Sequence, residues 1–167
     1  SFSPPFGYEL AARRVREDEA GNFDLKSWRV AGVGAEPIRT EPLEKFADLL
    51  APSGFDRRSF VPSYGMAECS LAVTFAPLGQ GADVDHVDIG ALAEEQKARP
   101  LHPKQDNLSA RSTNFTNCGA PLPGYEVEIR DDQGQVLAER HCGTLYVKGP
   151  SVMSGYFGDL KSTREVL

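Results

Sequence analysis

The length of 167 residues suits one domain with a sizeable hydrophobic core. The chain is 40% hydrophobic and 25% charged with a net charge of −6, a globular composition that argues against a nucleic-acid-binding surface. No stretch approaches the roughly 18 apolar residues of a membrane span. We therefore expect neither a nucleic-acid partner nor a membrane span.

The start of the chain and its cysteines indicate its origin and its compartment. The chain begins with Ser1 instead of an initiator Met, and no signal-peptide pattern follows, so we interpret it as a piece of a longer protein. The three cysteines, Cys69, Cys118 and Cys142, are widely spaced and form no CxxC pair, which predicts neither a disulfide framework nor a zinc site. These features indicate a reducing cytoplasm.

The sequence of residues 6–50 predicts a helix, a strand and a second helix. Residues 6–16 have an amphipathic pattern, and residues 29–34 form a short apolar run that is typical of a buried parallel strand. The next helix covers residues 41–50, and Thr40 is its expected cap. Its apolar stripe, at helical spacing, is Leu43, Phe46, Ala47 and Leu50.

A second strand begins at residues 60–61 and leads into the sequence PSYGMAECS. A helix is expected to start at Glu68. Residues 29–68 therefore predict the order strand–helix–strand–helix, which is a βαβ unit in a parallel sheet. Ligands bind at the carboxyl ends of parallel strands in such sheets. We therefore expect two loops, residues 34–37 and 63–68, to face one crevice.

The second of these loops carries residue types that suit a nucleotide. Tyr64 offers an aromatic face, Gly65 allows close backbone approach, and Glu68 offers oxygen ligands that suit Mg²⁺ beside phosphates. Such residues serve packing and capping more often than chemistry, so this interpretation depends on the rest of the chain.

Residues 71–75 predict another strand, and the composition then changes. Residues 77–114 are rich in Gly and Pro, with one short possible strand at 84–89 and one helical patch at 91–99. A loop of this length is usually functional or mobile, although a surface insertion without chemistry is an equally good interpretation.

From residue 116 the apolar pattern alternates every second residue. Strands are predicted at residues 125–129, 135–137 and 145–148, and a helix begins at residue 160. The predicted fold class is α/β: a partial parallel sheet with flanking helices, followed by a small antiparallel, barrel-like β subdomain. We divide the chain into residues 1–76, an insertion-like excursion at 77–114, and residues 115–167.

Four stretches match a known family in order and spacing: GAEP at 34–37, SYGMAE at 63–68, CGAPLPG at 118–124 and GTLYVKGPSVMSGYF at 143–157. Together they resemble the adenylate-forming (ANL) superfamily of acyl- and aryl-CoA ligases, luciferases and peptide-synthetase adenylation domains. The sequence DLKSWR at 24–29, with the forms of the first two motifs, is similar to fatty acyl-AMP ligases. The resemblance implies an internal fragment of the large N-terminal domain.

This resemblance implies that ATP and a fatty acid give acyl-adenylate, and that the acyl group then passes to an acyl carrier protein. Glu68 would be catalytic and would hold Mg²⁺ at the phosphates, and Tyr64 would stack on adenine. Phe6 and Tyr8 would border the acyl pocket. The remaining residues expected to bind ATP and AMP are Gly34, Ala35, Glu36, Pro37, Ser63, Gly65 and Met66.

Two alternatives remain open. The first is a fatty acyl-CoA ligase on the same fold; residues 77–114 fall where fatty acyl-AMP ligases carry an insertion associated with poor use of CoA. The second is a non-catalytic, adenylation-like module that binds a carrier or partner, since Pro5 and Val33 replace the family's usual Asn. The sequence contains no phosphate loop, ribose-binding Asp or C-terminal lysine domain of the family, so we expect these residues alone to be inactive.

Overall fold

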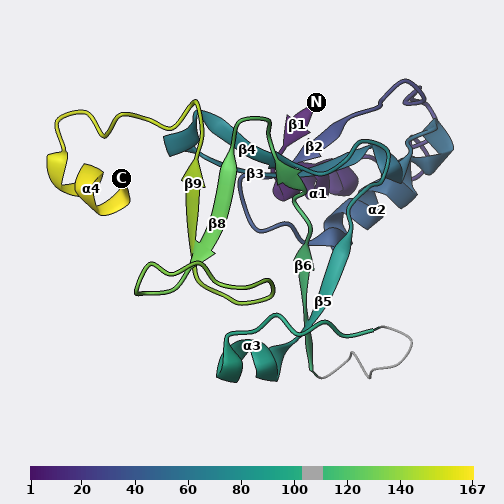
Figure 1. Cartoon of the computed structure of the whole chain (residues 1–167). Helices are drawn as coiled ribbons and strands as arrows, with labels where there is room; N and C mark the ends of the chain where they lie inside the picture. Colours follow the sequence, from purple (N-terminus) through teal and green to yellow (C-terminus); the bar gives the residue numbers. More distant parts are fainter. Residues whose placement is uncertain (103–110) are drawn as a thin grey trace.

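A computed structural model describes residues 1–102 and 111–167, which fold into a mixed five-stranded sheet and two smaller antiparallel sheets (Figure 1). The strand order of the large sheet is β1-β2-β3-β4-β7. The first three strands are parallel, and β4 and β7 are antiparallel to their neighbours. The strands are β1 (Phe2–Ser3), β2 (Ala31–Val33), β3 (Phe60–Met66), β4 (Leu71–Phe75) and β7 (Ala120–Pro121). The predicted α/β class is confirmed.

Helices α1 (Pro5–Arg14) and α2 (Thr40–Leu50) differ slightly from their predicted bounds. The predicted apolar stripe of α2 is buried throughout, as its spacing requires. The predicted cap is wrong, because α2 includes Thr40 and the capping position belongs to Arg39, which makes no side-chain capping bond.

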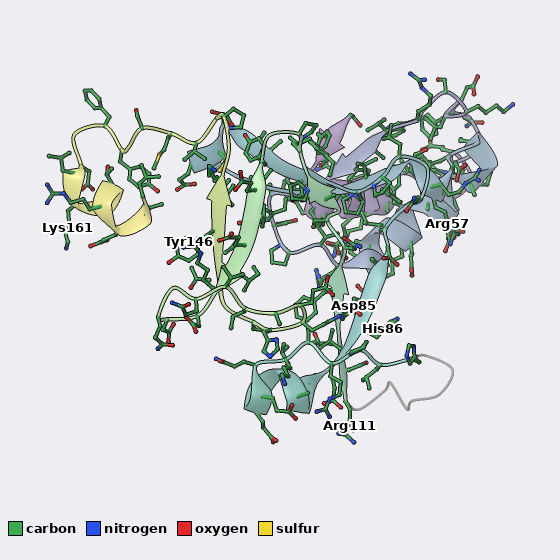
Figure 2. The ribbon with its side chains drawn as sticks, in the orientation of Figure 1. Arg57, Asp85, His86, Arg111, Tyr146 and Lys161 are labelled. Carbon is green, nitrogen blue, oxygen red and sulfur yellow. The ribbon has the colours of Figure 1, made fainter. Side chains whose placement is uncertain are left out.

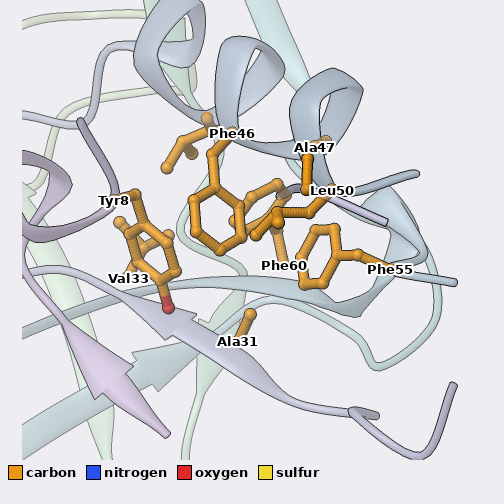
Figure 3. Packing of buried hydrophobic residues seen from close by; sticks show 10 residues of the cluster. Tyr8, Ala31, Val33, Phe46, Ala47, Leu50, Phe55 and Phe60 are labelled. Atoms are coloured by element: carbon orange, nitrogen blue, oxygen red, sulfur yellow. The ribbon is translucent and has the colours of Figure 1, made fainter. Parts of the chain in front are cut away.

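An aromatic cluster joins the two helices to the sheet (Figure 3). The ring of Phe46 on α2 meets Tyr8 on α1 edge to face, with centroids 5.2 Å apart. Tyr8 meets Phe60 of β3 at 5.4 Å, and Phe55 packs against both Phe46 and Phe60. Edge-to-face contacts favour a fixed arrangement of rings, so this cluster fixes α1 and α2 over the parallel strands.

The turn after β3 is not the start of a helix, and this prediction is wrong. Strand β3 continues through Met66, a single 3₁₀ turn (Ala67–Cys69) follows, and β4 returns antiparallel beside β3. The register shifts between Tyr64 and Gly65, which marks a bulge in the hairpin. The motif therefore lies on a strand and a tight turn instead of in a strand-to-helix loop.

The excursion contains a two-stranded sheet. Strand β5 (Val84–Asp88) pairs with β6 (Ser112–Thr116), which the sequence analysis did not predict, and α3 (Ile89–Glu95) lies between them in the chain. The Asp88 carboxylate caps α3 through the Ala91 amide. Residues 103–110 of the excursion lie outside the described residues, and the proposed division at 114/115 falls within β6.

The last part of the chain is antiparallel, as predicted. Strands β8 (Glu126–Arg130) and β9 (Thr144–Lys148) form a hairpin, and α4 (Leu160–Val166) follows at the end of an extended segment (Figure 1). The strand predicted at 135–137 is wrong: this segment makes one isolated bridge, between Arg130 and Val136.

The loop between β8 and β9 is bonded to the excursion. The Arg140 guanidinium forms an ion pair with Asp85 of β5, which Figure 2 labels, and donates to the carbonyl of Ala98 at 3.3 Å. Backbone hydrogen bonds of 2.8 Å join Ala98 N to Arg140 O and Cys142 N to Gln96 O. The excursion is therefore attached to the hairpin at several points. In the part of the chain that the structure describes, no helix is long and apolar enough to cross a membrane.

Candidate nucleotide site

A pocket of about 290 Å³ opens at the carboxyl end of the parallel strands. Its walls come from the end of β1, the turn after β2, and the β3–β4 hairpin, so the predicted crevice between neighbouring strand ends exists. The lining residues are Phe2, Ser3, Pro4, Gly34, Ala35, Ser63, Tyr64, Gly65, Leu71, Ala72 and Phe75.

Gly34 and Ser63 form the tightest part of the wall. A Cβ atom on Gly34 would lie 2.7 Å from the Ser63 hydroxyl and 2.8 Å from the Ser63 carbonyl oxygen. The Ser63 hydroxyl donates to the carbonyl of Val33 at 3.1 Å, which holds the β2 and β3 ends together. Glycine at position 34 therefore allows the ends of β2 and β3 to approach this closely.

Tyr64 lines the pocket and is 39% exposed. Partial burial, followed by the charges of Cys69 and Glu68, raises the pKa of this phenol above its usual value. Tyr64 is therefore a neutral aromatic surface at physiological pH, which suits stacking on a flat ring.

Gly65 has no space for a side chain. A Cβ atom there would lie 1.5 Å from the carbonyl oxygen of Leu71 on the opposite strand. The close approach of β3 and β4 at the bulge therefore depends on glycine at this position. Met66, the last residue of β3, is half-buried and lies outside the pocket lining.

The turn after β2 only partly enters the pocket. Ala35 lines it and adopts a left-handed backbone with φ of 69°, while Glu36 and Pro37 are exposed and do not line it. One carboxylate oxygen of Glu36 accepts a hydrogen bond from the Phe6 amide at 3.0 Å. This contact joins the turn to the first turn of α1.

The two aromatic residues assigned to the acyl pocket lie elsewhere. Tyr8 is 3% exposed, packs in the core, and donates through its hydroxyl to the carbonyl of Gly32 at 2.8 Å. Phe6 is 59% exposed and does not line the pocket. Their acyl-pocket role stays a prediction, and the geometry gives Tyr8 a clear packing role.

An apolar wall that the sequence analysis did not single out completes the pocket. The Phe2 ring lies so close over Gly32 that a Cβ there would be 2.3 Å from it. Phe2 also meets Phe75 edge to face, with ring centroids 5.7 Å apart. The feature that links Phe75 to the pocket is its pairing with Ser63 across the hairpin. This pairing can be recognised only once β4 is known to return antiparallel beside β3.

Glu68 lies outside the pocket lining, in the 3₁₀ turn that joins the lining strands β3 and β4, and is partly exposed. The Tyr156 hydroxyl donates to one of its carboxylate oxygens, and this hydrogen bond, followed by that of its own amide, lowers the pKa of Glu68. The same hydrogen bond raises the pKa of Tyr156. Glu68 is therefore an ionised carboxylate held by a neutral phenol.

The small number of carboxylate ligands at Glu68 suits a cation that binds mainly to phosphate oxygens. Among residues 1–102 and 111–167 there is no cluster of three or more metal-binding side chains. Mg²⁺ keeps several waters and commonly uses one or two carboxylates together with substrate phosphates. One partly exposed carboxylate, on the turn of the hairpin that lines the pocket, fits that pattern, whereas a protein-only metal cage would need more ligands.

Comparison with known proteins identifies the family of the chain. The family model described as "AMP-binding enzyme" matches residues 2–157, which is nearly the whole chain. The chain belongs to the AMP-binding enzyme family.

Two relatives show the degree of sequence similarity. A putative acyl-CoA synthetase of Caulobacter vibrioides is 45% identical over the full 167 residues, and the chain spans 28% of its length. The medium-chain-fatty-acid–[acyl-carrier-protein] ligase JamA of Moorena producens is 34% identical over 99% of the chain, again across 28% of its length.

Solved structures agree with the fold. A structure from a study of fatty acyl-adenylate ligases of E. coli and L. pneumophila has a TM-score of 0.89 and 44% identity, over 99% of this chain and 30% of the other. A fatty acyl-adenylate ligase from L. pneumophila in complex with acyl adenylate and pyrophosphate has a TM-score of 0.86 and 29% identity, over 98% and 28%. The chain therefore spans less than a third of the AMP-binding enzymes it matches.

Proposed function

We propose that this chain supplies part of the active site of a ligase that activates a fatty acid with ATP to an acyl-adenylate. The observation that carries the proposal is the pocket in which Gly34, Ser63 and Tyr64 meet at the strand ends, with Glu68 on the turn of the hairpin that lines it. An L. pneumophila relative of the same fold was solved with acyl adenylate and pyrophosphate, which supports this choice of ligand.

The adenine ring would stack on Tyr64 and approach the backbone at Gly34 and Ala35, which line the pocket. Glu36 and Pro37 would border this site from the turn after β2. Ser63, Gly65 and Met66 would lie along the path from the base to the α-phosphate. An uncharged base suits this largely apolar region better than a charged group does.

The phosphates would lie toward Glu68. A carboxylate oxygen of the fatty acid would attack the α-phosphorus of ATP, and the bond from that phosphorus to the oxygen bridging the α- and β-phosphates would break, which releases pyrophosphate. Glu68 would hold Mg²⁺, which neutralises phosphate charge when it is bound. The residues of the chain contribute mainly by positioning, which is the main requirement of phosphoryl and nucleotidyl transfer.

We place the acyl chain against the apolar wall of Phe2 and Phe75 rather than in the core around Tyr8. Phe2 is 58% exposed and Phe75 lines the same pocket, so both rings are accessible to a hydrocarbon. Burial of each methylene contributes about 0.8 kcal/mol, which favours such a surface for a fatty acid.

For the acceptor we propose an acyl carrier protein. The relatives JamA and TtuA are named as ligases of medium-chain fatty acids with an acyl carrier protein. A C. vibrioides relative is named as a putative acyl-CoA synthetase, which favours coenzyme A as the second candidate. The phosphopantetheine thiol of either acceptor would attack the acyl carbonyl, and AMP would leave.

The acceptor is tested with the full-length protein, ATP and a medium-chain fatty acid. Acylated carrier protein, detected by intact-protein mass spectrometry, should form at least about tenfold faster than acyl-CoA; a tenfold rate ratio corresponds to about 1.4 kcal/mol in the barrier. Faster formation of acyl-CoA would replace the first candidate by the second.

The assignment of Glu68 is tested by Glu68→Gln in the full-length protein. Loss of the anionic metal ligand should lower ATP–pyrophosphate exchange by about 10²-fold or more. The matched control is Glu126→Gln on β8, where the carboxylate pairs with Lys148 at 3.1 Å and lies on an exposed hairpin. Unchanged exchange in Glu68→Gln would refute the assignment, and no exchange in the unmodified protein would favour a non-catalytic partner-binding module.

We further propose a cytoplasmic location. Cys69, Cys118 and Cys142 are all unpaired, and Cys142 is exposed. Free thiols of this kind persist in a reducing compartment. Fractionation of cells that carry a tagged full-length protein tests this, and recovery in a secreted or periplasmic fraction would contradict it.

A further inference from the structure

The segment after β9 folds back onto the turn that carries Glu68. The Met153 amide donates to the carbonyl of Glu68 at 2.7 Å, and the Ser151 hydroxyl donates to the carbonyl of Cys69. The Ser70 hydroxyl in turn donates to the carbonyl of Ser151 at 3.3 Å. Residues more than 80 positions away along the chain therefore hold the carbonyls of Glu68 and Cys69, which belong to a single 3₁₀ turn.

The β8–β9 hairpin fixes where this segment begins. Gly149 directly follows β9, and a Cβ atom there would lie 2.4 Å from the ring of Tyr125. The Tyr125 hydroxyl bonds to the Ser151 hydroxyl. Tyr125 thus anchors the segment without touching the Glu68 carboxylate.

Tyr156 is held from the opposite side. Its amide donates to the Thr163 hydroxyl at 2.9 Å, and that hydroxyl donates to the carbonyl of Asp159 at 2.7 Å at the start of α4. The Tyr156 hydroxyl donates to the carboxylate of Glu68. Elsewhere in residues 1–102 and 111–167, no side chain donates to that carboxylate.

We propose that Tyr156 is a positioning residue for Glu68, whose carboxylate it holds through one oxygen while the second oxygen stays available to a divalent cation on the nucleotide. This inference rests on the proposed function, since it needs a nucleotide with its metal at the pocket. A free glutamate has several rotatable bonds, and restricting them before the cation arrives removes part of the entropic cost of binding. Partners that orient metal ligands commonly change metal affinity by about 10- to 100-fold.

The test compares three variants of the full-length protein: Tyr156→Phe, which keeps the ring and removes the hydroxyl, Tyr125→Phe as the matched control, and Glu68→Gln. Mn²⁺ serves as the probe, and its binding in the presence of ATP is measured by electron paramagnetic resonance. The Mg²⁺ dependence of adenylate formation is measured in parallel.

Tyr156→Phe should weaken Mn²⁺ binding about tenfold. It should also raise the Mg²⁺ concentration for half-maximal adenylation by a larger factor than it lowers kcat at saturating Mg²⁺. Tyr125→Phe should leave Mn²⁺ affinity as in the unmodified protein. In the Glu68→Gln background, Tyr156→Phe should have no further effect, because its partner has already been altered.

Two outcomes separate this inference from the proposed function. If Glu68→Gln weakens Mn²⁺ binding and Tyr156→Phe does not, Tyr156 only anchors α4: the inference is wrong and the proposed function stands. If neither variant changes Mn²⁺ binding, Glu68 is not the metal ligand and both fail. An equal loss in Tyr125→Phe and Tyr156→Phe would assign the effect to the whole segment and would also overturn the inference.

Discussion

Tyr8 shows how a single buried hydroxyl joins α1 to the sheet. Its ring meets Phe46 and Phe60 in the core, and its hydroxyl bonds to the carbonyl of Gly32 in β2. Burial raises the pKa of Tyr8 to about 12. The residue thus combines apolar packing with one hydrogen bond between α1 and strand β2.

Tyr8→Phe should lower the free energy of unfolding by about 1 kcal/mol below pH 9, through loss of this hydrogen bond. An unfolded Tyr ionises near pH 10. Because the folded pKa is raised to about 12, stability present below pH 10 is lost as the pH rises from about 10 toward 12. Denaturant unfolding of both proteins between pH 8 and 11.5 measures the difference, which should shrink across that range.

The control for this prediction is Tyr146→Phe on β9, where the ring is 45% exposed and contacts the Arg130 guanidinium through its face. This variant should change stability by less than about 0.5 kcal/mol. Equal losses in the two variants, or titration of Tyr8 near its ordinary pKa, would contradict the role assigned to the buried hydroxyl.

At the scale of elements, the β3–β4 hairpin decides the shape of the site. Its strands approach so closely at the bulge that the Leu71 carbonyl occupies the place of a side chain at Gly65. Ser70 and Leu71 both have positive φ, of 53° and 95°, which is the backbone cost of returning within one turn.

Gly65→Ala should therefore destabilise the protein by more than about 2 kcal/mol, or prevent the hairpin from forming in this register. Thermal unfolding of the full-length variant measures this. Gly21→Ala is the control, since a Cβ at Gly21 meets nothing within 4 Å, and its stability should change by less than about 0.5 kcal/mol. A Gly65→Ala protein as stable as the control would show that the two strands can separate at the bulge.

The elements that sequence predicted are those whose pattern is local. The stripe on α2 repeats at i, i+3, i+4 and i+7, so its buried face follows from the residues themselves. Strand β1 has only two residues and carries no periodicity, and it exists because Phe2 and Ser3 pair with Gly32 and Val33. The hairpin was missed because its turn depends on clearance between Gly65 and a residue on another strand.

Some contacts of the candidate site could likewise be predicted from sequence, and others could not. The convergence of Gly34 and Tyr64 could be predicted, because parallel strands place their carboxyl ends at one edge. The contact of Tyr156 with Glu68 could not, since 88 residues separate the two and neither residue carries a local signal of the other. The apolar wall of Phe2 and Phe75 was also hidden, because it joins the first strand to the fourth.

At the scale of the whole molecule, the excursion connects the large sheet to the β8–β9 hairpin. The Arg140–Asp85 ion pair and the backbone bonds at Gln96 and Ala98 join it to the loop between β8 and β9. On the side of the large sheet, the hydroxyl of Thr116, which ends β6, donates to the carbonyl of Ile38 at 2.8 Å, close to the turn after β2. The excursion is therefore supported on two sides.

Arg140→Ala should loosen the excursion with little effect on global stability. The side chains of Arg140 and Asp85 are 48% and 37% exposed, and such pairs contribute about 0–1 kcal/mol. Amide hydrogen exchange, measured by mass spectrometry, should become several-fold faster across residues 84–99. The control is Arg57→Ala, which removes an exposed ion pair with Asp48 on α2. No change in exchange, or the same change in the control, would contradict the predicted attachment.

The register between β4 and β7 has a consequence for how such proteins diversify. Phe75, just before the excursion, pairs with Ala120, just after it, and the Thr74 hydroxyl donates to the carbonyl of Cys118 at 2.7 Å. The two ends of the excursion therefore meet side by side at the edge of the sheet. The cost of closing a loop grows only slowly with its length. Evolution can therefore lengthen, shorten or replace the residues between these ends without displacing the strands that line the pocket.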